Sequence, residues 1–110
     1  MLKQSPYVKL RVSVPVEHAD KMRKVLGDAG AGKQGSYSYC SGSYKVTGRF
    51  LPEVGAHPAI GKIGEHEEVE EEVIETLCHT DILETVIAAV KKEHPYEEPP
   101  IDIIPRLALE

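Results

Sequence analysis

The sequence predicts a small α+β domain of the split βαβ type, and three observations carry this prediction. A chain of 110 residues is long enough for one hydrophobic core and too short for a second. Hydrophobic residues make up 41% of the chain, yet it has no Trp and a single Phe, which predicts an aliphatic core. Segments with two-residue periodicity alternate with segments of helical periodicity. We therefore expect one domain over residues 1–110, with Leu109-Glu110 interpreted as a candidate cloning scar.

The first half of the chain is expected to form a strand, a helix and a β-hairpin. Alternating Val and Leu residues over 8–14 predict a half-buried strand. Apolar residues at helical spacing predict an amphipathic helix over residues 17–29, closed by Gly30. Residues 36–51 are rich in Tyr, Ser, Thr and Val, and we interpret them as two short strands joined by a turn at 43–45.

The second half is expected to contribute a loop, a strand and the clearest helix of the chain. Residues 52–64 carry several structure breakers and predict a loop. The acidic segment 65–79 has a β-branched second half, which favours a strand there. Asp81 and Glu84 form a D-x-x-E capping pair for a helix that must stop at His94, because a following proline disfavours the helical backbone.

A short strand over residues 101–104 completes the predicted order, β-α-β(β)-β-α-β. This order is the ferredoxin-like arrangement with an extra hairpin strand. In that arrangement the first and third main strands are central and the last strand lies at an edge of the sheet. The prolines agree, since Pro99, Pro100 and Pro105 are expected to flank a strand that could not be central.

Composition and charge exclude several function classes. A formal net charge of -5 and scattered basic residues argue against nucleic-acid binding, which needs clustered Lys and Arg. No apolar run approaches the length needed to cross a membrane, and no secretory signal is visible, so we expect a cytoplasmic protein. Cys40 and Cys78 are widely separated and are expected to be free thiols in a reducing compartment.

A glycine-rich segment matches two nucleotide-binding motifs in residue pattern but not in the secondary structure expected around it. Residues 30–35 read G-x-G-x-x-G, and residues 27–33 read G-x-x-x-x-G-K. Both motifs need a strand before the loop and a helix N-terminus after it, so that amides point at phosphate. Here the loop follows a predicted helix, whose C-terminus carries the wrong partial charge. We predict a helix cap and turn rather than a phosphate site.

Neither metal binding nor catalysis has a recognisable pattern in the sequence. None of the five histidines shows the spacing of a closed metal site. Nucleophilic catalysis by Cys40 is the weakest hypothesis, because no histidine partner can be assigned to it. We predict no cofactor, no resident metal, no catalytic residues and no enzymatic activity.

The strongest candidate site is the segment His-Pro-Tyr-Glu-Glu-Pro at residues 94–99, the 94–99 turn. Its two prolines stiffen the connection, so that His94, Tyr96, Glu97 and Glu98 have little conformational freedom to lose on binding. A polar turn with all side chains in solvent is the alternative interpretation. We expect Tyr96 or Glu98 to be at least partly buried, within the domain or at a subunit interface.

The sequence HPYEEPPIDIIP resembles the closing motif of two related groups. One comprises the CutA proteins of divalent-cation tolerance, and the other is the PII/CutA-like insert domain of the YqfO-type dimetal proteins, also called GTP cyclohydrolase type I-like. The middle of the chain, from GAGKQGSYSYC to EEVEEEVIET, resembles the insert domain nearly throughout. The resemblance covers roughly residues 7–105. The resemblance therefore identifies the chain as a suspected stand-alone insert domain. The larger domain of the family, which holds the two-metal site, is expected to be absent.

The resemblance implies a fold, a tendency to assemble and a set of candidate ligand or interface residues. These residues are His94, Tyr96, Glu97 and Glu98 of the 94–99 turn, together with Tyr37 and Cys40. The implied function is a non-catalytic binding or regulatory module for an unidentified small molecule or protein. The implied assembly is a homotrimer, or a dimer as second choice, with residues 36–51 as the expected contact. The alternative function is a CutA-like divalent-metal-binding protein using His94 and glutamates.

Overall fold

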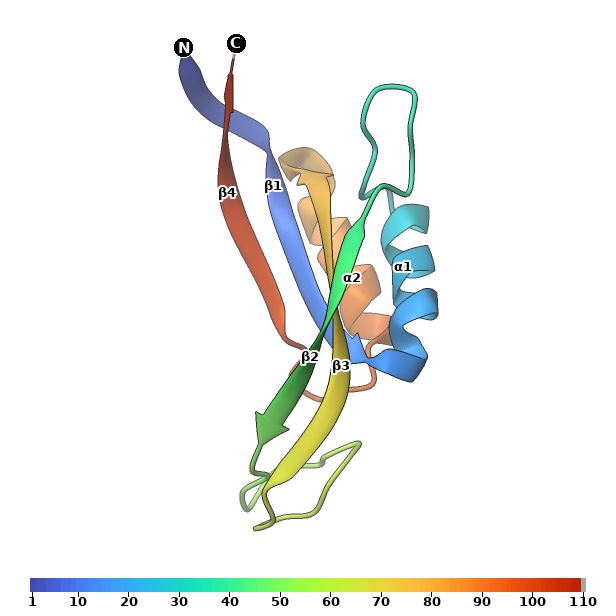
Figure 1. Cartoon of the computed structure of the whole chain (residues 1–110), viewed down its shortest axis with the longest axis vertical. Helices are drawn as coiled ribbons and strands as arrows, with labels where there is room; N and C mark the ends of the chain where they lie inside the picture. The colour runs from blue at the N-terminus through green and yellow to red at the C-terminus, as the bar shows by residue number, and fades with distance from the viewer. Residues whose placement is uncertain (110) are drawn as a thin grey trace.

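The computed structural model describes residues 1–109, which form one antiparallel sheet with two helices on one face (Figure 1). The strand order is β2-β3-β1-β4, and short 3-10 turns precede both helices. The elements in chain order are β1 (Leu2–Pro15), α1 (Ala19–Asp28), β2 (Gly42–Phe50), β3 (Glu67–His79), α2 (Leu83–Glu93) and β4 (Ile101–Leu109). The predicted α+β class and ferredoxin-like arrangement are confirmed, with the first and third strands in the centre and the last at an edge.

The core is aliphatic, as the composition predicted, and lies between the sheet and the two helices. The alternating residues of β1 point toward the helices, and Leu10, Val12 and Val14 have no measurable exposure. They pack against helix residues spaced by whole turns and against the inward positions of β3. The other members of this cluster include Met22, Leu26, Ile74, Cys78, Val86 and Val90. The opposite face of the sheet, which we call the open face, carries no helix (Figure 1).

The predicted hairpin over residues 36–51 is wrong, because only β2 forms there and the expected turn at 43–45 lies inside it. The segment before β2 is a loop, and its backbone hydrogen bonds go to the turn after α1 and to a side chain of β3 rather than to the backbone of a neighbouring strand. The Cys40 N–H donates to the Gly32 carbonyl at 2.9 Å, and the Thr76 hydroxyl donates to the Cys40 carbonyl at 2.7 Å. Tyr39 has a φ of 58°, which interrupts an extended chain. Residues 1–109 therefore form four strands, without the predicted extra one.

The Tyr39 ring explains why this loop lies on α1. A Cβ added at Gly27 would be 1.8 Å from the Tyr39 ring, so the ring occupies the space that glycine leaves on the helix. The Tyr39 hydroxyl donates to Asp28 at 2.6 Å. The glycine-rich residues 30–35 form the turn after α1, where Gly30, Gly32 and Gly35 have positive φ, as expected for a helix cap and turn.

Several element boundaries differ from the predictions. The acidic segment is a strand from Glu67 onward, because β3 pairs along its first half with β2. The predicted Asp81–Glu84 capping pair is not formed; the His79 ring nitrogen accepts the Asp81 N–H instead. The second helix ends before His94 as predicted.

The last strand is longer than predicted and runs through Pro105. This proline was expected to flank the strand, yet it pairs with Val8 of β1. A proline is tolerated there because β4 is an edge strand and the register with β1 shifts between Gln4 and Val8. Of the two residues interpreted as a cloning scar, Leu109 ends β4 and Glu110 lies outside the described residues.

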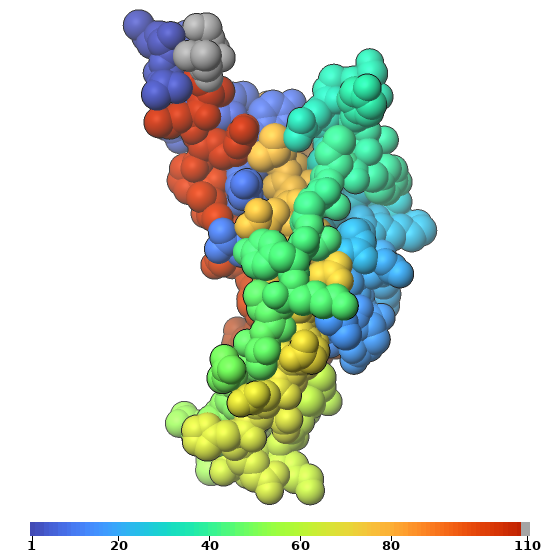
Figure 2. All heavy atoms as spheres, viewed as in Figure 1, coloured from blue at the N-terminus to red at the C-terminus, as the bar shows by residue number. Residues whose placement is uncertain are grey.

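The two chain ends and the long loop lie at opposite ends of the molecule. Leu2 and Leu109 are register partners, so the outer ends of β1 and β4 run side by side. At the other end, residues 51–66 project beyond the helices and sheet (Figure 2). No helix in residues 1–109 is long and apolar enough to cross a membrane.

Candidate functional site

His94 anchors the 94–99 turn to the sheet through one ring nitrogen and makes a hydrogen bond within the turn through the other. Its side chain is buried, and Nε2 lies 2.7 Å from the Ser13 carbonyl oxygen. Nδ1 accepts the Tyr96 N–H at 3.0 Å. Because Nδ1 accepts and a carbonyl cannot donate, Nε2 carries the proton of a neutral imidazole. Burial lowers the pKa of His94 below its usual value, which favours this neutral form.

Tyr96 reaches from the turn to a buried carboxylate on β3. Its hydroxyl donates to Glu71 Oε2 at 2.6 Å, and the Ser13 hydroxyl donates to Glu71 Oε1 at 2.7 Å. Glu71 is only 5% exposed. Burial, followed by the hydrogen bond to Glu71, raises the pKa of the Tyr96 phenol. The phenol therefore remains a proton donor throughout the neutral range.

Gly48 of β2 makes room for this carboxylate. A Cβ at this position would lie 2.5 Å from Glu71 Cδ and Oε2, so any other residue would displace the carboxyl group. Close approach explains the glycine here, since Gly48 does not have positive φ. Strand β2 therefore helps to place the Glu71 carboxyl group, although the hydroxyls that donate to this group come from Ser13 of β1 and Tyr96 of the turn.

The 94–99 turn and the loop after β2 (residues 51–66) line a partly open cavity of about 280 Å³. The loop is held to the turn where the His57 N–H donates to Glu97 Oε1 at 3.0 Å. The Phe50 and Tyr96 rings meet edge to face with their centroids 6.0 Å apart. The lining residues are Gly48, Arg49, Phe50, Leu51, Pro52, Ala56, Pro58, Ala59, Ile60, Glu71, Tyr96, Glu97, Glu98 and Pro100.

The structure brings together three of the six candidate residues. Tyr96, Glu97 and Glu98 line one cavity, and the expected partial burial is met by Tyr96, whereas Glu97 and Glu98 are exposed. His94 lies behind them and contacts the Tyr96 ring.

The remaining two candidates lie elsewhere. Cys40 contacts Thr76, in the half of β3 remote from Glu71, and the loop that carries it is at the opposite end of the fold from the 51–66 loop (Figure 1). Tyr37 of the same loop is 75% exposed. Neither residue contributes to the cavity.

Sequence reasoning did not find Glu71, Ser13, Gly48 or the walls supplied by residues 56–60. Glu71 is one of seven glutamates between positions 65 and 75, and nothing in its own type marks it. Once β3 is known to begin at Glu67, two-residue alternation places Glu71 on the same face as Val73 and Glu75. That alternation was the sequence signal that could have identified the face on which Glu71 lies.

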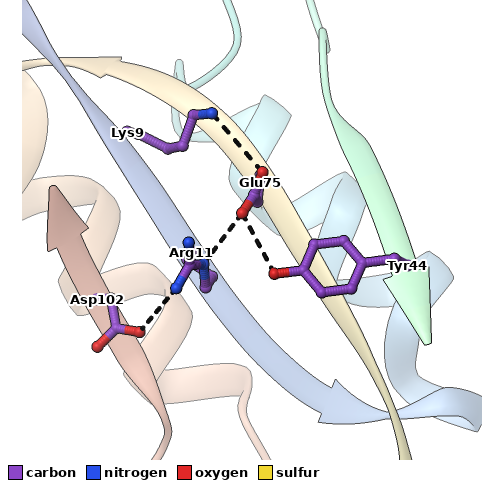
Figure 3. Close-up of polar contacts among 5 residues, drawn as sticks. All are labelled: Lys9, Arg11, Tyr44, Glu75 and Asp102. Atoms are coloured by element: carbon purple, nitrogen blue, oxygen red, sulfur yellow. Dashed lines mark hydrogen bonds and ion pairs between the residues drawn. The ribbon is translucent and has the colours of Figure 1, made fainter. Parts of the chain in front are cut away.

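The open face also carries a network of paired charges centred on Glu75 (Figure 3). Glu75 accepts from Arg11 Nε at 3.0 Å and lies 3.7 Å from Lys9 Nζ, and the Tyr44 hydroxyl donates to it at 3.4 Å. Arg11 also lies 3.8 Å from Asp102. The hydrogen bond from Arg11 lowers the pKa of Glu75, so this carboxylate is charged and neutralised by its neighbours.

Glu71 differs from Glu75 in having no cationic partner. Within residues 1–109, no Lys, Arg or His forms an ion pair with it. Nor do three His, Cys, Asp or Glu side chains anywhere in those residues cluster closely enough to hold a metal ion.

Comparison with known proteins confirms the resemblance seen in the sequence. No family model matches the chain. It is 52% identical over 97 residues to a GTP cyclohydrolase 1 type 2 homolog of Halalkalibacterium halodurans, covering 88% of this chain and 26% of the relative. The Bacillus subtilis protein of the same name is 46% identical over 100 residues, covering 91% and 27%. The chain thus spans about a quarter of the length of these relatives.

Two solved structures show the same fold. A Bacillus cereus protein related to NIF3 matches with a TM-score of 0.79 and 42% identity, over 96% of this chain and 26% of that one. The periplasmic divalent cation tolerance protein CutA of Archaeoglobus fulgidus matches with a TM-score of 0.67 and 20% identity, over 91% and 83%. The second likeness concerns the fold alone.

Proposed function

We propose that this chain, a homologue of one segment of the GTP cyclohydrolase 1 type 2 homologs, is a non-catalytic binding or regulatory module. Its ligand site is the cavity between the 94–99 turn and the loop after β2. The observation that carries the proposal is the cavity itself: about 280 Å³, with mainly apolar walls and a few polar groups at one side. This combination is typical of small-molecule sites.

The side chains around the cavity support binding rather than catalysis. Both ring nitrogens of His94 are engaged by backbone groups, so the imidazole is not presented to a ligand. The Tyr96 hydroxyl already donates to Glu71. Cys40 lies remote from both, and Cys78 is buried in the core, which raises the pKa of its thiol. Among the described residues that line the cavity there is no Cys, Ser, Thr or His.

The site is tested by titrating the ¹⁵N-labelled protein with benzyl alcohol, a small neutral probe that the cavity can hold. We expect amide shift changes confined to the segments that line the cavity, residues 48–60, 71 and 96–100. Ala56→Phe, which fills the cavity, is expected to abolish them, whereas Ala88→Phe on the exposed side of α2 is expected to retain them. Shift changes elsewhere, or none with benzyl alcohol and its charged analogues, contradict the proposal.

We also propose that the module acts as a homotrimer, with a dimer as second choice. Strand β2 forms one edge of the sheet, and most of its residues are exposed. An exposed edge with unpaired backbone groups is a ready surface for pairing with another chain. Light scattering at micromolar concentration is expected to give three times the mass of one chain, and a monomer contradicts the proposal.

A further inference from the structure

We propose that the cavity beside Tyr96 binds a small organic cation, a protonated amine carried on an apolar body, with Glu71 as its counter-charge. This inference rests on the proposed function, because it names the ligand class of the same site. Three features carry it: a buried carboxylate without a cation, the acidic surroundings of the cavity, and apolar walls of a definite size.

Glu71 supplies the recognition group. It is only 5% exposed, and the hydrogen-bond donors to its carboxylate within residues 1–109 are the hydroxyls of Ser13 and Tyr96. Two hydroxyls stabilise a carboxylate but do not neutralise it, and a carboxylate can accept about four hydrogen bonds. A buried charge is costly unless it is paired. An ammonium group in the cavity would supply the missing positive charge and further donors.

Another carboxylate on the same strand, Glu75, is neutralised by basic side chains of the protein itself. Glu75 lies on the same face of β3 as Glu71, and there Arg11 and Lys9 converge on it (Figure 3). No Lys or Arg approaches Glu71 in this way in residues 1–109, and burial favours the neutral form of the nearby His94, although Glu71 is the more buried of the two carboxylates. Because Glu71 has no such basic neighbour, a cationic ligand could supply its counter-charge.

The other charged groups around the cavity reinforce this preference. Glu97 and Glu98 line it, and the single basic lining residue is Arg49. Arg49 is engaged by Glu68, with 3.5 Å between Nε and Oε1. The rim is therefore acidic, which attracts cations and disfavours anions.

The walls define the rest of the ligand. Phe50, Pro52, Ala56, Pro58 and Ile60 present apolar surface. A cavity of roughly 150 Å³ holds benzene in other proteins, and this one has about 280 Å³. The ligand is therefore expected to be the size of one aromatic ring or a short alkyl chain with its charged head group.

The test compares three probes of one shape and different charge: benzylamine, benzyl alcohol and benzoate, each titrated into the ¹⁵N-labelled full chain at pH 7. We expect benzylamine to bind at least tenfold more tightly than benzyl alcohol, and benzoate more weakly than either. Glu71→Gln is expected to reduce benzylamine binding to the level of benzyl alcohol. Glu84→Gln, a matched loss of charge on the exposed side of α2, is expected to change nothing.

Two further measurements keep the inference testable if Glu71→Gln fails to fold. Raising the salt concentration is expected to weaken benzylamine binding and to leave benzyl alcohol unchanged. Glu97→Gln is expected to weaken benzylamine binding several-fold. Equal binding of benzylamine and benzyl alcohol at the cavity overturns the cation inference and leaves the cavity as a ligand site. Binding of none of the three probes there overturns both.

Discussion

At the scale of single residues, Tyr96 and His94 are the two side chains described above that join the 94–99 turn to the sheet. Tyr96→Phe keeps the ring and removes only the hydroxyl that Glu71 accepts. We expect the free energy of unfolding to fall by about 1–3 kcal/mol, because a buried carboxylate loses one of two donors. Urea denaturation measures this.

Tyr37→Phe is the matched control for this substitution. Tyr37 is 75% exposed, so its loss of a hydroxyl is expected to change stability by no more than about 0.5 kcal/mol. Equal effects of the two substitutions, or no effect of Tyr96→Phe, would show that the contact with Glu71 contributes nothing to folding.

His94 makes stability depend on pH in a predictable direction. Its pKa is lowered in the folded protein from an ordinary value of 6.5, chiefly by burial. As pH falls below 6.5, the unfolded chain takes up a proton first, so the stability contributed by the neutral imidazole is present above this pH and is lost below it. Urea midpoints measured from about pH 7.5 down to about pH 5, on both sides of the ordinary histidine pKa, should show this fall.

The substitution that isolates this effect is His94→Gln, which removes the titrating ring. Its stability is expected to vary less over the same pH range than that of the unsubstituted protein. His66→Gln is the control, because His66 is exposed, and it should retain the original pH profile. Parallel profiles for His94→Gln and the unsubstituted chain would contradict the assignment.

At the scale of elements, β2 positions the site through one glycine. Gly48→Ala would put a Cβ 2.5 Å from the Glu71 carboxyl group and force it away from Ser13 and Tyr96. We expect a loss of about 1–3 kcal/mol in thermal or urea denaturation, the cost typical of a buried polar group that loses its partners.

Gly42→Ala in the same strand provides the comparison. Nothing lies within 4 Å of a Cβ at Gly42, and neither glycine has positive φ. This substitution is expected to be neutral or to stabilise the protein by up to about 1 kcal/mol, because alanine restricts the unfolded chain. If both substitutions behaved alike, the close approach of Glu71 to β2 would not be a determinant of the site.

At the scale of the whole molecule, metal binding through His94 and glutamates is the alternative hypothesis from the sequence, and a direct measurement tests it. Calorimetric titration with zinc, copper and manganese is expected to give no sub-micromolar, one-per-chain binding. The physical reason is that residues 1–109 hold no cluster of three ligating side chains. A tight constant with one ion per chain would favour the CutA-like alternative over the binding module proposed above.

The sequence by itself determined the architecture of this protein. Two-residue alternation in β1 and helical spacing in α1 and α2 identify the elements that build the core, because these periodicities follow from backbone geometry alone. The order of elements then implied the strand order, and the prolines placed β4 at an edge. The 94–99 turn was also visible, since proline restricts the backbone locally.

Only the tertiary structure decided where the loop before β2 lies and which carboxylate is buried. The loop has strand-like composition, but its hydrogen bonds go to Gly32 and Thr76, and no periodicity encodes such distant partners. Glu71 looks like its acidic neighbours until Ser13, Gly48 and Tyr96 surround it from three separate segments. Burial and cavity shape depend on contacts between residues far apart in the chain, and local sequence patterns do not contain that information.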